Sequence, residues 1–195
     1  MATLDELEQS VIKITKRPDQ SARIRKAIKT ATLKAHRKGF FARDLDRDLV
    51  VISQAANSGV FDISTQFPLL RKILAVYPVI DGKLQNPLTV VDADNLIGHF
   101  GTPKADIYYQ SGEEINFHTS YAYQSFVVVA YNNPNVSDSA YSSWVANNYE
   151  DCITFEASRQ VLASIGKEAE ANSLEKNRND SYAELIRDNL EQEDH

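Results

Sequence analysis

The sequence has little of what catalysis, metal binding and membrane insertion require. Cys152 is the single cysteine among 195 residues, which excludes an intrachain disulfide and a metal site made of several cysteines. In an apolar helix pattern, a lone cysteine is most simply a small buried hydrophobic side chain. No apolar run reaches the roughly eighteen residues of a membrane-spanning helix, and Met1–Gln20 lacks the apolar centre of a secretory signal. We therefore expect a protein that is made and kept in the cytoplasm, without membrane contact.

The common sequence motifs of enzymes are also missing. The chain contains no GxxxxGK[ST], GxGxxG, GxSxG or HExxH pattern. Its four histidines lie far apart in sequence, and His118 alternates with apolar neighbours in a predicted strand, which explains it better than catalysis does. We predict that the protein is not an enzyme and has no cofactor and no metal.

Charge is present but unevenly distributed. The chain is 43% hydrophobic and 25% charged, as in ordinary soluble globular proteins, and its formal net charge is −6. Between Lys13 and Arg47, twelve Lys and Arg face three acids, a local net charge of +9. Between Gly166 and His195, nine acids face four bases, a local net charge of −5. Such opposite poles suit association of identical subunits, although two solvated faces of opposite sign would produce the same pattern.

Two helices are expected at the start of the chain. Thr3 and Glu6 have the spacing of a capping box, which predicts a helix to about Ile14. Pro18 suits the first residue of a second helix, because its missing N–H costs nothing there. The apolar series from Ile24 to Ala35 forms one narrow face of this helix, with several alanines that favour close approach to another helix.

The middle of the chain changes to a two-residue period, which indicates strands. We leave residues 67–77 undecided between helix and strand, and expect a strand followed by a helical turn from about Asp92 within Leu88–Phe100. Strands are predicted at Phe40–Phe41, Leu49–Ile52, Val60–Ile63 and Ser125–Tyr131, with a hairpin over Ile107–Phe117 that turns at Gly112.

The C-terminal part reads as a helical hairpin over Tyr141–Leu190, with its turn at Gly166. We expect its first helix to pack on the N-terminal helices and Trp144 to anchor the core. The predicted fold class is α+β, mainly α: a helical bundle from the terminal helices with a β-rich insertion. The predicted segments are 1–39, 40–138 and 139–195, within a single structural unit.

Three stretches together resemble a known family. They are the hairpin Ser111–Phe117 with the strand Ser125–Tyr131, the segment Tyr141-Ser142-Ser143-Trp144-Val145, and the run Phe155–Gln160 that leads through Gly166 into an acidic terminal helix. In this order they resemble the head-to-tail adaptor (connector or tubular tail) proteins of tailed bacteriophages, closest to those of short-tailed phages. The resemblance covers the C-terminal half best.

The resemblance implies a structural virion protein at the head–tail junction, assembled in the host cytoplasm. It implies a homo-oligomeric ring, commonly a dodecamer, that binds the portal protein above and a tail or nozzle protein below. DNA would pass through the lumen without sequence-specific binding, and no cofactor is required. For the tail-facing loop we predict Ser111, Gly112, Glu113 and Glu114. For portal binding we predict a segment near the end of the chain, which can order against a partner: Tyr182, Leu185, Ile186, Asn189 and Leu190.

A nucleic-acid-binding module is the alternative hypothesis. The helix over residues 18–38 carries a predicted basic surface that could follow a phosphate backbone. Against this, its charges are scattered around the helix and no aromatic residues lie between them for base stacking. The residues of this surface are Arg23, Arg25, Lys26 and Lys29.

The alternative predicts an affinity for DNA that falls steeply as salt rises, because binding would release counterions from the phosphates. Neutralising Arg23, Arg25 and Lys26 should abolish it. A fluorescence anisotropy titration with a DNA duplex at several salt concentrations measures this, and absence of binding at low salt removes the hypothesis.

Overall fold

The chain divides into two compact units, one helical and one made of strands. The structure is a computed structural model that describes residues 2–91 and 105–193, with side chains described up to residue 189. The β unit spans Leu45–Asn132, and the helical unit is formed by the segments before and after it. Each unit has its own hydrophobic core.

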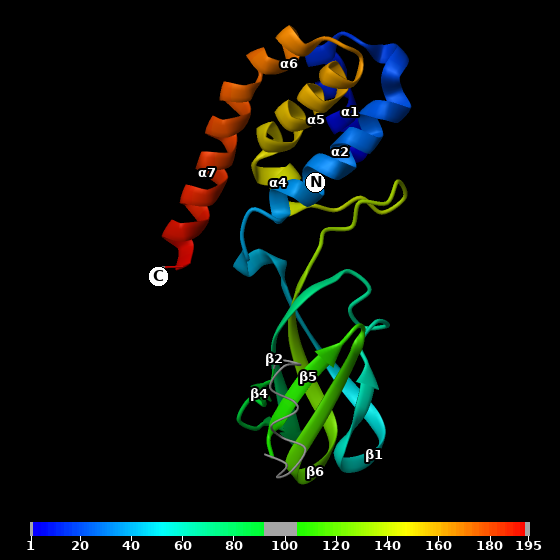
Figure 1. The fold of residues 1–195 in the computed structure, drawn as a ribbon, viewed down its shortest axis with the longest axis vertical. Helices are drawn as coiled ribbons and strands as arrows, with labels where there is room; N and C mark the ends of the chain where they lie inside the picture. The colour runs from blue at the N-terminus through cyan, green and yellow to red at the C-terminus, as the bar shows by residue number, and fades with distance from the viewer. Residues whose placement is uncertain (1, 92–104, 194–195) are drawn as a thin grey trace. The chain divides into compact units, whose positions relative to one another are not determined.

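The helical unit (Figure 1) contains six α-helices in its described part. Its first helix starts at the predicted capping box: the Thr3 amide donates to Glu6 Oε2 at 2.8 Å, and the Glu6 amide donates to Thr3 Oγ1 at 3.2 Å. The helices are α1 (Leu4–Thr15), α2 (Ser21–His36), α4 (Trp144–Asn148), α5 (Glu150–Ser164), α6 (Glu168–Ser173) and α7 (Glu175–Glu193).

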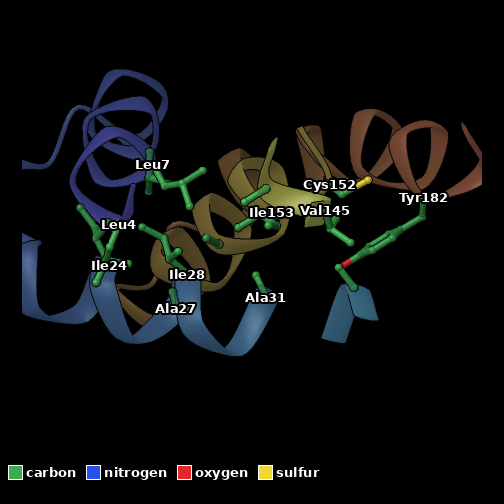
Figure 2. Packing of buried hydrophobic residues seen from close by; sticks show 14 of the residues in the cluster. Leu4, Leu7, Ile24, Ala27, Ile28, Ala31, Val145, Cys152, Ile153 and Tyr182 are labelled. Atoms are coloured by element: carbon green, nitrogen blue, oxygen red, sulfur yellow. The ribbon is translucent and has the colours of Figure 1, made fainter. Parts of the chain in front are cut away.

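Helix α5 is the centre of this unit and packs against all five of the others. Figure 2 shows side chains of α1, α2, α5 and α7 converging in one cluster, where Ile153 of α5 is fully buried. The predicted packing of the first C-terminal helix on the N-terminal pair is confirmed. It follows from apolar positions three and four residues apart on each helix. The cluster includes Leu4, Leu7, Val11, Ile24, Ala27, Ile28, Ala31, Val145, Cys152, Ile153, Ala157, Val161, Tyr182 and Leu185.

The predicted turn at Gly166 is also confirmed. Gly166 has φ +77°, and the Lys167 amide donates to the Leu162 carbonyl at 3.0 Å, so that the left-handed residue closes α5. The helix expected after this turn is divided at Leu174, where α6 ends and α7 begins.

The described part of the β unit is a curled sheet of six strands. Strand β6 is its spine: β1 pairs antiparallel along one edge of β6, while β2 and β5 share the other edge. Strand β4 pairs with β5 in parallel, which makes the sheet mixed. The strands are β1 (Leu45–Asp62), β2 (Leu70–Ile80), β3 (Lys83–Leu84), β4 (Thr89–Val90), β5 (Ile107–Ser111) and β6 (Glu114–Asn132) (Figure 1).

The core of the β unit follows from the two-residue period of its strands. Phe126 and Val128 of β6 are fully buried, whereas Val127 between them is only partly buried, because successive side chains point to opposite faces. Phe126 stacks on Phe61 with ring centroids 5.2 Å apart, and Phe117 lies 4.7 Å from Phe126. These aromatic contacts join Phe61 of β1 to Phe117, in the half of β6 that pairs with β5, and to Phe126, in the half that pairs with β2.

The predicted fold class, mainly helical with a β-rich insertion, is wrong in its proportions. The chain is roughly 43% helical and 34% strand, with a sheet of six strands. Polar residues at Ser53–Ser58 conceal the continuity of β1, a strand of 18 residues that contains the predicted strand Leu49–Ile52 and the predicted strand Val60–Ile63 as far as Asp62. Within that stretch only Ala56 and Ser58 pair with β6, and the register shifts on both sides of Ala56, so the strand continues through an irregular segment that the two-residue period does not reveal.

Other local predictions have mixed outcomes. Phe40–Phe41 is not a strand but precedes a short 3-10 turn at Ala42–Asp44, and the undecided residues 67–77 contain most of β2. The hairpin that turns at Gly112 is confirmed. The helical turn expected from Asp92 lies outside the described residues. No helix within the described ranges combines the length and apolarity that crossing a membrane requires.

Removal of the β unit should leave the helical unit folded. Leu45 pairs with Tyr131, so that the chain enters and leaves the sheet on adjacent strands, and every described residue of the helical core comes from the helical unit. We predict that a variant with a short Gly/Ser loop in place of residues 47–129 unfolds cooperatively with a helical circular dichroism spectrum. Loss of cooperativity would contradict this. As a control for native packing, adding Ile153→Ala to the variant should lower its stability by about 2–5 kcal/mol.

Candidate assembly surfaces

The predicted basic surface on α2 is divided into two parts by its ion pairs. The Arg25 guanidinium pairs with Asp5 and, at 2.7 Å, with Glu8. Lys29 Nζ lies 3.0 Å from Asp138. These two cations are therefore neutralised by α1 and by the segment that returns from the β unit.

Arg23 and Lys26 lie on a different flank of α2 and form no ion pair within the described part of the chain. Both are exposed. They line a groove of about 290 Å³ between α2 and α5, which we call the basic groove. Its other lining residues are Ala27, Thr30, Gln160, Val161 and Ser164. The groove thus has apolar residues beside cations that are free to meet an external anion.

The opposite end of α5 carries negative charge. Glu150 and Asp151 in its first turn, with Glu184 of α7, line a hollow of about 260 Å³, and we call these three residues the acidic edge. Burial, then the charges of Asp151 and Glu184, raise the pKa of the Cys152 thiol to about 12. Cys152 is buried and donates from Sγ to the Ser181 carbonyl at 3.1 Å, so it is the inert hydrophobic residue that the sequence predicts.

The residues predicted to bind a portal are divided between core and surface. Tyr182 and Leu185 belong to the helical core (Figure 2), with Leu185 fully buried. Ile186 is 38% exposed, and the half-buried Asn189 donates from Nδ2 to the Leu185 carbonyl at 2.8 Å. The side chain of Leu190 lies outside the described part. An external partner can therefore reach Ile186, whereas Tyr182 and Leu185 hold α7 on the bundle.

The residues predicted to face the tail lie together at the turn of the β5–β6 hairpin. Ser111 pairs with Glu114, Gly112 has φ +62°, and all four residues of the turn, Glu113 included, are exposed. Their carboxylates give this turn a negative charge.

A buried carboxylate connects α2, α5 and α7. Glu156 of α5 is 1% exposed, and its oxygens lie 2.6 Å from Lys34 Nζ and 3.5 Å from an Arg178 nitrogen. Gln160 also donates to it at 2.9 Å. Burial raises the pKa of Glu156, but the hydrogen bonds from Lys34 and Gln160 and the charges of Lys34 and Arg159 outweigh it, so the pKa is lowered overall.

A second buried polar network was missed by the sequence analysis. His36 Nδ1 lies 2.8 Å from Asp44 Oδ1, and its Nε2 lies 2.9 Å from Ser143 Oγ. Trp144 Nε1 donates to Asp44 Oδ1 at 2.7 Å, and Arg43 lies over the Trp144 ring. No sequence motif reveals this network, because its two halves, His36 with Asp44 and Ser143 with Trp144, are 100 or more residues apart.

The network contains the groups of a Ser–His–Asp triad, but its serine is buried and caps a helix, which is a structural role and not a catalytic one. A nucleophilic serine needs an accessible hydroxyl. Ser143 is 4% exposed, and its Oγ accepts the Ala146 amide at 3.1 Å as the N-cap of α4. We assign the network to joining the end of α2, the Asp44 turn and the start of α4. In the part of the chain that the structure describes, no group of His, Cys, Asp and Glu is placed to hold a metal ion.

The β unit has an unusually apolar surface. Leu49 and Val51 of β1 are 49% and 58% exposed and lie on the outer face of the sheet, opposite the buried Val50. The backbone register places Leu49 beside Val127, which in turn lies beside Tyr77. Further exposed apolar side chains on the strands are Val60, Leu74, Ile80, Leu84 and Val90. Apolar side chains that adjoin one another on a surface, as those of Leu49, Val127 and Tyr77 do across three strands, are typical of surfaces that bind another protein.

Comparison with known proteins does not assign the chain to a family. No protein-family model matches the sequence, and a search of curated proteins finds no significant match.

Replacing Glu156 by Gln should destabilise the helical unit. The change removes the carboxylate that Lys34 and the half-buried Arg178 share inside the helical unit and leaves Arg178 with the exposed Glu175, which costs on the order of 2 kcal/mol at pH 7. Because the folded-state pKa is lowered, this stabilisation is present above the unfolded pKa of about 4.5 and is lost as the pH falls through the folded value. Urea unfolding at pH 7 and pH 3 measures the effect.

The difference in the free energy of unfolding between the parent chain and Glu156→Gln should be smaller at pH 3 than at pH 7. The exposed Glu168→Gln serves as a control that changes stability by less than about 1 kcal/mol. Equal effects of the two substitutions at pH 7 would contradict a central role for Glu156.

Proposed function

We propose that the protein is a structural subunit of a homo-oligomeric ring at the head–tail junction of a tailed bacteriophage. In this role it is a head-to-tail adaptor that binds a portal protein on one side and tail or nozzle proteins on the other, with DNA passing through the lumen. The observation that carries the proposal is the exposed apolar face of the β unit around Leu49 and Val51. A surface of this kind supports a protein that functions in contact with further subunits.

The polar clusters of the helical unit are consistent with a structural role. Glu156 and His36 are both buried and hydrogen-bonded to groups of neighbouring helices and turns. They hold the helical unit together and present no reactive group to solvent. The resemblance of the C-terminal half to head-to-tail adaptors supports the specific assembly that we propose.

The ion pairs of α2 argue against the alternative hypothesis of DNA binding by the basic helix. Arg25 and Lys29 are neutralised within the chain, so only Arg23 and Lys26 of the predicted surface remain for phosphates. Two cations beside an apolar groove make few of the phosphate contacts on which non-specific DNA binding depends.

Native mass spectrometry of the chain, alone and mixed with purified portal rings of its phage, tests the proposal. We expect a ring of about twelve copies on the portal, as the resemblance implies, because head-to-tail contacts between identical subunits close into rings. The proposal is wrong if the chain remains monomeric, does not bind the portal and is absent from virions.

A matched pair of substitutions in the β unit tests whether the apolar face takes part in ring assembly. Val51→Lys places a charge among exposed apolar residues and should reduce ring formation. Thr65→Lys, at an exposed position in the turn after β1, serves as the control with the same added charge. Equal assembly of both variants would remove the apolar face from the ring contact.

A further inference from the structure

We propose that the basic groove of one copy binds the acidic edge of a second copy, in a head-to-tail contact between helical units. The inference rests on the proposed ring and names the surfaces that join its subunits. The groove contributes Arg23 and Lys26, and the edge contributes Glu150, Asp151 and Glu184.

The charges of α2 show why the groove needs an external partner. On one flank, Arg25 and Lys29 are satisfied by carboxylates of the same chain. On the other flank, Arg23 and Lys26 are exposed beside Ala27 and Val161, and no carboxylate in the described ranges pairs with them. Apolar lining with unpaired cations fits a protein surface that carries carboxylates.

The acidic edge has the complementary property. Asp151 and Glu184 are exposed, and no Lys, Arg or His within the described residues forms an ion pair with either. Their negative potential reaches the protein interior: after burial, the charges of Asp151 and Glu184 are the next causes that raise the pKa of the Cys152 thiol. A cation supplied from outside would relieve this accumulation of like charge.

The two surfaces cannot meet within one chain, because they lie at opposite ends of the rigid helix α5 (Figure 1). Glu150 and Gln160 are ten residues apart, roughly 15 Å along the helix axis. A contact between two different surfaces of identical subunits is heterologous, and it forms a closed ring when the rotation between copies permits closure. A second copy is therefore a better occupant of the groove than a nucleic acid, since the same chain carries the complementary acids.

Exchange of charges tests the contact. Lys26→Glu and Glu184→Lys are both at exposed positions, and each alone should weaken self-association by about tenfold or more through like-charge repulsion. The double variant, with both substitutions in one chain, should recover association, because the charges are exchanged and not lost. An equimolar mixture of the two single variants should also associate, since each supplies the surface that the other needs.

Sedimentation velocity of the chain over a range of concentrations and salt measures these effects. The exposed Lys83→Glu on β3 serves as the control with the same change in net charge, and circular dichroism verifies that each variant is folded. Either of two results would overturn the inference: a parent chain that stays monomeric at every concentration, or single variants that associate as the parent does.

The two proposals fail separately. If the chain binds portal rings and is present in virions, but the single variants associate as the parent does, the ring proposal is retained and this contact is rejected. Absence from virions, with no response to the portal, would reject the ring itself, even where the charge exchange restores a dimer.

Discussion

The packing of α5 against α2 is the contact on which the helical unit depends. Both helices present small and branched apolar residues to each other, and the ion pair between the exposed Lys34 and the buried Glu156 bridges them. Helix α7 then closes over α5 through Tyr182 and Leu185, with Arg178 reaching the same carboxylate. A buried carboxylate is tolerated only where its charge is matched, which restricts how the three helices can be arranged.

This arrangement also decides which charges of the chain remain available. Packing α1 beside α2 brings Asp5 and Glu8 to Arg25, whereas no carboxylate among the described residues forms an ion pair with Arg23 or Lys26. The same α5 that forms one wall of the basic groove carries acids at its other end. Folding thus converts a strongly basic segment into one satisfied flank and one unsatisfied flank.

In the β unit, the long strand β6 has the corresponding role. Because its two halves pair with different strands on one edge and with β1 on the other, a single strand joins the whole sheet. Its inward residues form an aromatic core around Phe126, while its outward residues continue the apolar surface of β1.

The sequence by itself determined most helices, the hairpin at Gly112, the end of α5 at Gly166 and the burial of Cys152, because caps, turns and helical periodicity are local signals. Only the tertiary structure decided that β1 is continuous, since pairing with β6 before and after the irregular stretch Ser53–Ser58 carries one strand across it. The tertiary structure also determined which residues form the candidate surfaces. The pairing of Arg25 with Glu8, the network of His36 with Ser143, and the freedom of Arg23 and Lys26 depend on contacts between segments distant in the chain, or on their absence among the described residues. Residue spacing along one sequence carries no record of such contacts.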